Sequence, residues 1–143
     1  MEVVVLTTDS ELRTSFQASD SESSDPGQRD QHPVSEIQDL SPYGLLLASL
    51  GACTAILLFS FARNHRVPLS EVTMRLTYAR LFAAACQNCE KSGPYTERID
   101  AEVLLKGDLP PAERDKLFLI AKHCPVHKIL HNGIETEFHL AQG

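Results

Sequence analysis

The pattern of apolar and polar positions predicts strands at both ends of the chain and one long buried helix between them. Alternating residues indicate two short strands at Val3–Thr7 and Leu12–Gln17. The uncharged run Tyr43–Ala62 is too long for a strand and is apolar on every side. Such a run predicts a deeply buried helix, with a membrane span as the alternative.

Beyond this helix, the pattern is typical of a sheet-and-helix domain. Apolar residues alternate with polar ones over 72–78, 99–106 and 134–140, which predicts three half-buried strands. Between the last two, the segment Pro110–His123 begins with prolines that suit a first helical turn and continues with apolar residues at helical spacing. A helix is therefore predicted before the final strand.

Length and composition indicate one domain over residues 1–143. Apolar residues make up 43% and charged residues 22%, as in an ordinary globular protein. Residues 18–31 are rich in Ser, Asp and Glu and contain Pro26-Gly27, which predicts a mobile loop. The net charge of −6, from 13 basic and 19 acidic residues, would repel phosphate backbones. We therefore expect no nucleic acid partner.

The amino terminus and the long helix decide the expected compartment and assembly. No basic residue precedes the short first apolar run, so we expect no signal peptide and a cytoplasmic protein. The long helix is rich in small residues, and soluble-type patterning follows it, so a buried helix is favoured over a membrane span. Gly44, Ala48 and Ala52 line one face and would let another helix approach closely. A symmetric dimer would bury such a helix.

Cys124 is the first of two candidate reactive cysteines. Pro125 disfavours helical backbone at the residue before it and suits the first position of a new helix, which Asn132-Gly133 would close. Cys124 would then lie at a helix N-terminus, where N–H groups and the helix dipole favour thiolate, with His127 close by. The alternative is a core cysteine that completes the apolar stripe of the preceding helix.

Cys53 lies well inside the long helix, where the dipole cannot help it. Burial alone would raise its pKa, so it can be reactive only if a cation, such as an arginine, reaches it. From the residues alone, Cys53 is best interpreted as a small core residue.

Cys86 and Cys89 form a C-x-x-C pair in a polar connector. Together with Cys124 and His127 they would provide an acceptable tetrahedral zinc site. A dithiol switch and no role at all are the other hypotheses.

Two cysteine motifs follow one another along the chain: the stretch SPYGLLLASLGACT over residues 41–54, and then Cys124-Pro125-Val126-His127. Together and in this order, they resemble the OsmC/Ohr family of osmotically induced and organic-hydroperoxide-resistance proteins. The C-x-x-C connector and the Arg98-Ile99 strand resemble a general OsmC-like branch. The resemblance implies an α+β OsmC-like fold and an intertwined homodimer, with two antiparallel sheets wrapped around paired central helices.

The resemblance also implies a thiol-dependent peroxidase without metal or cofactor. Cys53 would attack an organic hydroperoxide and become a sulfenic acid, Cys124 would form a disulfide with it, and a dithiol reductant would restore both. Family hydroperoxidases carry a carboxylate near the helix start and an arginine from the early loop, whereas Tyr43 and Gly44 follow Pro42 here. The candidates for supporting roles are Arg13, Arg29, Glu36 and His127. The alternatives are a non-catalytic small-molecule binder or redox sensor and the zinc protein.

Overall fold

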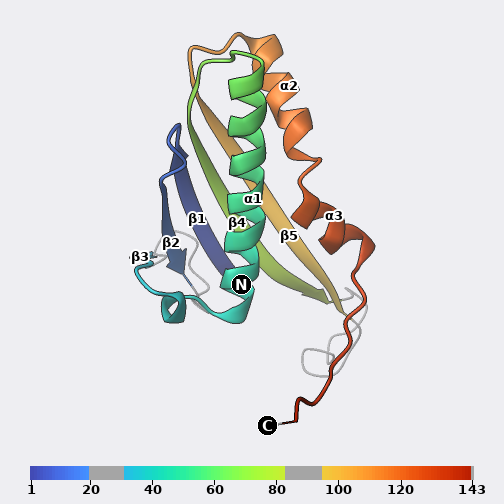
Figure 1. Ribbon diagram of the computed structural model, residues 1–143. Helices are drawn as coiled ribbons and strands as arrows, with labels where there is room; N and C mark the ends of the chain where they lie inside the picture. Colours follow the sequence, from blue (N-terminus) through green and yellow to red (C-terminus); the bar gives the residue numbers. More distant parts are fainter. Residues whose placement is uncertain (20–30, 83–94, 143) are drawn as a thin grey trace.

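The computed structural model describes residues 1–19, 31–82 and 95–142, which form an antiparallel sheet with helices on one face (Figure 1). The sheet has five strands in the order β3-β2-β1-β4-β5. The strands are β1 Glu2–Asp9, β2 Thr14–Ser19, β3 His32–Pro33, β4 Leu69–Phe82 and β5 Tyr95–Gly107. The helices are the short 3-10 helix η1 Ile37–Asp39, α1 Pro42–Asn64, α2 Pro111–Ala121 and α3 Pro125–Asn132. The predicted α+β class is confirmed.

Helix α1 begins at a capped N-terminus and runs along the sheet. The Ser41 hydroxyl oxygen accepts a hydrogen bond from the Gly44 N–H at 2.9 Å, and Pro42 occupies the first helical position. The buried face of α1 consists of small and apolar residues that pack on β1 and β4. Gly51 allows the closest approach, because a Cβ atom there would collide with the Leu6 and Leu76 side chains.

The register of the central strands creates the apolar floor under α1. Strand β1 pairs with β4 so that Val4 lies opposite Leu76 and Leu6 opposite Met74. All four side chains are buried. In Figure 1, α2 and α3 follow one another beside α1 on the same face of the sheet. The core therefore lies between the sheet and these three helices.

Most predicted elements are present with boundaries that differ by a few residues, and the second strand shows the clearest difference. Leu12 lies in the turn before β2 with φ 63°, a left-handed conformation that ends the hairpin turn, so the second strand starts only at Thr14. Ala18 and Ser19, assigned to the mobile loop, belong to β2 and are buried. The remainder of that loop, residues 20–30, lies outside the described residues.

The predicted final strand at 134–140 is wrong for the described chain. Residues 133–142 have no regular secondary structure, and Phe138 is 93% and Leu140 100% exposed. Figure 1 shows this segment leaving the domain beyond α3 without a neighbouring strand. A strand needs a partner for its backbone groups, and alternating sequence alone does not supply one.

Among the described residues, one helix, α1, is long and apolar enough to cross a membrane. The core helix of a globular domain meets the same criteria of length and composition. Because α1 packs a full face on the sheet, its hydropathy is weak evidence for a membrane span.

Candidate thiol site

Two cysteines that are distant in sequence meet between α1 and the start of α3. Cys53 lies in the middle of α1 and is partly exposed, whereas Cys124 precedes α3 and is fully buried. Both are free thiols, and their side chains hydrogen-bond to each other. The structure therefore holds a reduced dithiol in which each thiol influences the pKa of the other.

The backbone at Cys124 follows from the proline after it. Cys124 has φ −57° and ψ 129°, which is outside the helical region, and α3 begins at Pro125 as predicted. The Cys124 carbonyl oxygen accepts the first hydrogen bond of α3 from the Lys128 N–H at 3.1 Å. Cys124 is thus the N-cap residue of α3, and its sulfur lies among the free N–H groups of the first turn.

The surroundings of Cys124 favour its thiolate form. Burial is the largest single influence and raises the pKa of this thiol. Hydrogen bonds from the Thr54 hydroxyl, the backbone N–H groups of His127 and Val126, and the Cys53 thiol act in the opposite direction. Together they outweigh burial, so the pKa of Cys124 lies below its ordinary value.

The pKa of Cys53 is shifted in the opposite direction, above its ordinary value. Burial and then the hydrogen bond to Cys124 raise its pKa, and the Val126 backbone N–H lowers it less strongly. None of the causes of this shift is an arginine. Within the pair, Cys53 is therefore the thiol that keeps its proton longer as pH rises. It donates the hydrogen bond, and the Cys124 sulfur accepts it.

Of the predicted supporting residues, His127 influences Cys124 through its backbone N–H, whereas neither Arg13 nor Glu36 is among the groups that shift the pKa of either thiol. Arg13 is exposed in the turn between β1 and β2, where its Nε lies 2.8 Å from an Asp9 carboxylate oxygen. Glu36 is the N-cap residue of η1, and its backbone N–H donates to Asp39. Arg29 lies outside the described residues. The roles of all three in the chemistry stay predictions.

The zinc hypothesis also stays a prediction. Cys86 and Cys89 lie outside the described residues, and the described part of the chain brings together no group of three or more metal-binding side chains. His127 and His131 come close on α3, with ring centroids 6.3 Å apart. Two imidazoles alone fall short of the four ligands of a structural zinc site.

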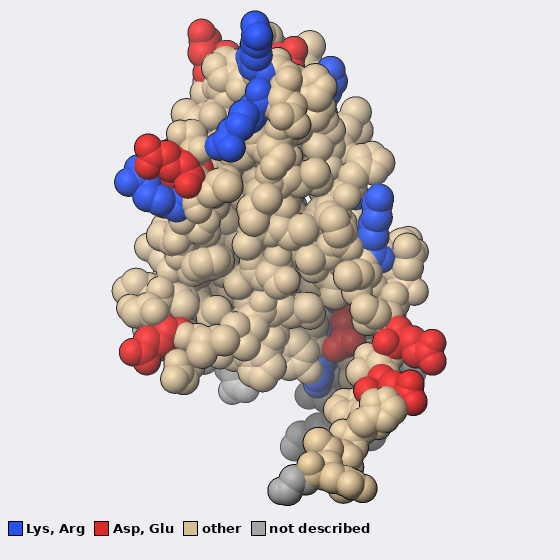
Figure 2. Space-filling model, viewed as in Figure 1, with Lys and Arg blue, Asp and Glu red and all other residues tan. Residues whose placement is uncertain are grey.

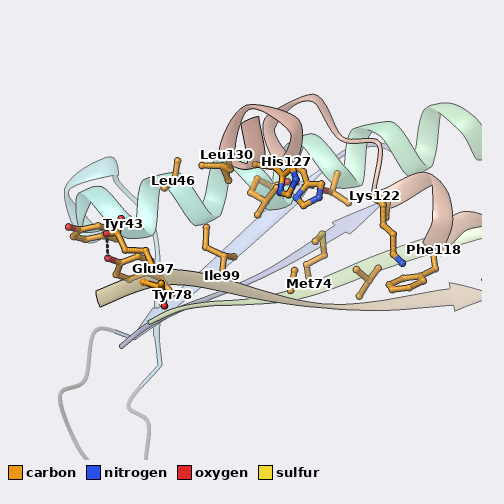
Figure 3. A pocket seen from close by; sticks show the side chains of 17 residues that line it. Tyr43, Leu46, Met74, Tyr78, Glu97, Ile99, Phe118, Lys122, His127 and Leu130 are labelled. Carbon is orange, nitrogen blue, oxygen red and sulfur yellow. Dashed lines mark hydrogen bonds between the residues drawn. The ribbon is translucent and has the colours of Figure 1, made fainter. Parts of the chain in front are cut away.

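A cavity of about 810 Å³ adjoins the dithiol, between α1, the strands β4 and β5, and the helices α2 and α3 (Figure 3). Most of its lining is apolar: Leu46, Leu50, Met74, Ile99, Ala101, Val103, Phe118, Ala121 and Leu130. Thr54 and His127 also line it, and both lower the pKa of the Cys124 thiol, His127 through its backbone N–H. Neither Cys53 nor Cys124 belongs to the lining, so the cavity approaches the dithiol through Thr54 and His127, which are neighbours of the Cys124 sulfur.

One end of the cavity carries a polar cluster that sequence reasoning missed. Tyr43 and Tyr78 stack with ring centroids 4.4 Å apart, and Tyr78 donates a 2.6 Å hydrogen bond to Glu97. Arg80 donates to the hydroxyl oxygens of Tyr43 and Tyr78 at 2.8 and 3.2 Å. Burial first, and then the Glu97 carboxylate, raise the pKa of Tyr78 to about 12. Figure 3 shows Tyr43, Tyr78 and Glu97 together at this end.

A carboxylate does reach the start of α1, although not from the predicted position. The Ser41 hydroxyl donates to Glu2, the first residue of β1. The residues around Ser41 give no signal for this contact, because it depends on how the sheet and helix pack. An anion at a helix N-terminus stabilises the helix, so Glu2 has a structural role at this point.

Comparison with known proteins places the fold. The sequence profile of the family described as "OsmC-like protein" matches residues 35–139. The structure is similar to an OsmC-like hydroperoxide resistance protein from Jannaschia sp. CCS1, with a TM-score of 0.63 and 16% identity over 99% of this chain and 95% of that one. It is also similar to an OsmC-like protein from Mycoplasma pneumoniae, with a TM-score of 0.51 and 16% identity over 90% and 86% of the two chains. No curated protein matches the sequence. The predicted OsmC-like fold is confirmed.

Proposed function

Because this chain belongs to the OsmC-like family, we propose that it is a thiol-dependent peroxidase that reduces organic hydroperoxides with Cys53 and Cys124. The observation that carries the proposal is the hydrogen-bonded dithiol beside an apolar cavity. The name of the Jannaschia protein, a hydroperoxide resistance protein, gives further support.

Accessibility and acidity divide the roles between the two sulfurs. Cys53 is the more exposed, so it meets the peroxide, whereas the buried Cys124 has the lower pKa and acts on the oxidised Cys53 in the second step. The Cys53 sulfur attacks one peroxide oxygen, and the O–O bond breaks. The proton that Cys53 gives up goes to the departing oxygen, so the alcohol leaves and Cys53 becomes a sulfenic acid.

The second step joins the two sulfurs. The Cys124 sulfur attacks the sulfenic sulfur of Cys53, a disulfide forms, and the hydroxyl leaves as water. A dithiol reductant then reduces the disulfide and is itself oxidised. The existing contact between the two side chains means that the resolving step needs little rearrangement.

The shape and lining of the cavity favour the organic class of peroxide. Its wall is mostly apolar, and its volume of about 810 Å³ is within the range of small-molecule sites. An alkyl or aryl group of the substrate would displace water from this wall, which hydrogen peroxide cannot do.

A homodimer is the proposed assembly. Figure 2 shows few charged side chains over the middle of the face that carries the three helices. Several large apolar residues are exposed on α1, on α3 and in the segment after it: Leu45, Leu46, Ile56, Ile129, Leu130, Ile134, Phe138 and Leu140. A second copy of the chain that covers this surface would bury these side chains, without the membrane that a spanning helix would need. We place the dimer in the cytoplasm, where thiols are kept reduced.

A non-catalytic ligand-binding or redox-sensing protein is the second candidate. It is favoured by the raised pKa of Cys53, because no arginine within residues 1–19, 31–82 and 95–142 contributes to activating this thiol. Such a protein would use the same cavity to hold an apolar molecule and would consume peroxide no faster than a free thiol.

Turnover by cysteine variants separates the two candidates. Reduced protein is mixed with cumene hydroperoxide and a dithiol, and peroxide loss is followed for Cys53→Ser, Cys124→Ser and a Cys86→Ser/Cys89→Ser control. We expect no turnover for Cys53→Ser, a trapped sulfenic acid for Cys124→Ser, and normal turnover for the control. Equal residual turnover in the two single variants would refute the peroxidase mechanism.

A further inference from the structure

Met74 is a buried thioether on the wall of the cavity. It lies near the middle of β4, and its side chain is 2% exposed. Strand register places Leu6 of β1 on one side of it and Val103 of β5 on the other, and Val103 also lines the cavity. Figure 3 shows Met74 on the sheet side of the cavity, across from His127 on α3. In the folded protein, the cavity is therefore the route by which a small molecule meets this side chain.

The sulfur of Met74 is a nucleophile that the dithiol mechanism leaves unused. A thioether carries no proton, so its lone pairs are free at every pH. It is also soft and polarisable, and oxidation converts it to a sulfoxide. The cysteine reaction needs a thiolate and then a second thiol, whereas a thioether needs neither. A peroxide in the cavity thus has a second sulfur within its walls.

We propose that Met74 is an oxidation site at which an organic hydroperoxide held in the cavity transfers one oxygen atom to the thioether. The sulfur attacks the terminal peroxide oxygen with a lone pair, so the S–O bond forms and the O–O bond breaks. The proton on the terminal oxygen passes to the departing oxygen. The products are methionine sulfoxide and the alcohol, and the peroxide itself is the oxidant, so that no other reactant takes part.

The lining of the cavity favours organic peroxides at this site. Because most of the wall is apolar, it concentrates a peroxide that carries an alkyl or aryl group and does not concentrate hydrogen peroxide. Met1, the other methionine of the chain, is 55% exposed and is not among the residues that line the cavity. Met1 therefore reports how fast each peroxide oxidises a thioether in solvent.

Oxidation of Met74 would change the cavity that permits it. A sulfoxide oxygen is a polar acceptor, whereas the residues paired with Met74 on the neighbouring strands are the apolar Leu6 and Val103. A polar atom on such a wall is costly to cover with an apolar group, so the oxidised cavity would bind organic peroxide less tightly. The change limits binding when peroxide outlasts the dithiol, and methionine sulfoxide reductases would reverse it.

The inference rests on the proposed function only in the binding of organic hydroperoxide in the cavity. It does not depend on the dithiol, and the test is therefore made without thiols in the variant Cys53→Ser/Cys86→Ser/Cys89→Ser/Cys124→Ser. If this variant does not fold, wild-type protein whose thiols have first been consumed by peroxide takes its place.

The test compares the two methionines within one protein. The folded protein is treated with cumene hydroperoxide or with hydrogen peroxide, and the rate of sulfoxide formation at each methionine is measured by peptide mass spectrometry. The selectivity is the Met74-to-Met1 rate ratio with cumene hydroperoxide divided by the same ratio with hydrogen peroxide. The reference is the selectivity of the protein unfolded in urea, where both side chains meet solvent.

A matched pair of variants tests whether the cavity is responsible. Ala101 is an exposed residue of the cavity wall on β5, so Ala101→Phe fills part of the space. Glu102→Phe is the control, because the next residue of a strand points to the opposite face of the sheet.

We expect the selectivity of the folded protein to exceed the reference at least about tenfold, since the aryl group of cumene hydroperoxide is buried in the cavity. Ala101→Phe should bring it toward the reference, and Glu102→Phe should leave it high. A selectivity no higher than the reference would overturn the inference, even if the wild-type protein consumes peroxide. Selective oxidation of Met74 in a protein whose dithiol does not turn over would instead reject the proposed function alone.

Discussion

Replacing Gly51 by alanine should separate α1 from the sheet and destabilise the protein. A Cβ atom there would lie 2.9 Å from a Leu76 methyl carbon and still closer to one of Leu6. Both leucines are fully buried, so neither can move into solvent. Overpacking in a core costs up to about 3 kcal/mol, and alanine recovers about 1 kcal/mol of helix propensity over glycine. We expect a net loss of about 2 kcal/mol in the free energy of unfolding.

The assay is urea unfolding of reduced protein at one fixed concentration, because any dimer would make stability depend on concentration. Ser60→Ala, at an exposed position of α1, is the control and should change stability by less than about 0.5 kcal/mol. Leu6→Val removes the nearest colliding methyl and leaves contacts at 2.9 Å to Leu76 and 3.2 Å to the Cγ of residue 6, so Gly51→Ala should cost at least about 0.5 kcal/mol less in that background. Unchanged or increased stability of Gly51→Ala would refute the close packing of α1.

The remaining predictions concern pH dependence and assembly. The pKa of Tyr78 is raised from 10.0 to about 12, so the folded protein holds this proton where the unfolded chain has lost it, and stability should fall as pH rises through that interval. Tyr78→Phe should weaken this fall, and equal slopes in unfolding measurements would contradict the assignment. If the proposed dimer forms through this tail, Phe138→Glu should shift it toward monomer in analytical ultracentrifugation, whereas Glu137→Gln should not. A dimer that tolerates Phe138→Glu would exclude the tail from the interface.

Much of the fold could be predicted because it follows from local periodicity. The uncharged run from Tyr43 predicts α1 to within a few residues, and alternation predicts the long strands β4 and β5. Pro125 fixes the break between α2 and α3 through its effect on Cys124. These features depend on residues that are close together in the sequence, so they can be predicted from the sequence alone.

The final strand shows where such reasoning ends. The segment from Ile134 to Leu140 alternates as a half-buried strand does, yet it is exposed along its length in the described chain. Alternation reports which side chains favour burial, but it does not say which surface buries them. A partner from a second copy would satisfy the same pattern, which is why the dimer proposal and this segment are tested together.

The site itself was less predictable, because it depends on contacts between distant segments. Residue chemistry alone made Cys53 a core residue, and only the family resemblance paired it with Cys124. The contacts of Glu2 with Ser41 and of Arg80 with Tyr43 arise from packing and strand register. Thr54 carries a weak signal, since a threonine beside a cysteine in an apolar helix must satisfy its hydroxyl.

The most direct test of the peroxidase proposal is to identify the first disulfide that peroxide produces. Reduced protein is treated with an equimolar amount of cumene hydroperoxide, blocked with an alkylating reagent, and mapped by mass spectrometry. A bond between Cys53 and Cys124, formed with the loss of both thiols and the release of the alcohol, is the predicted result. Intact Cys53 and Cys124 thiols, or a bond confined to Cys86 and Cys89, would contradict the account.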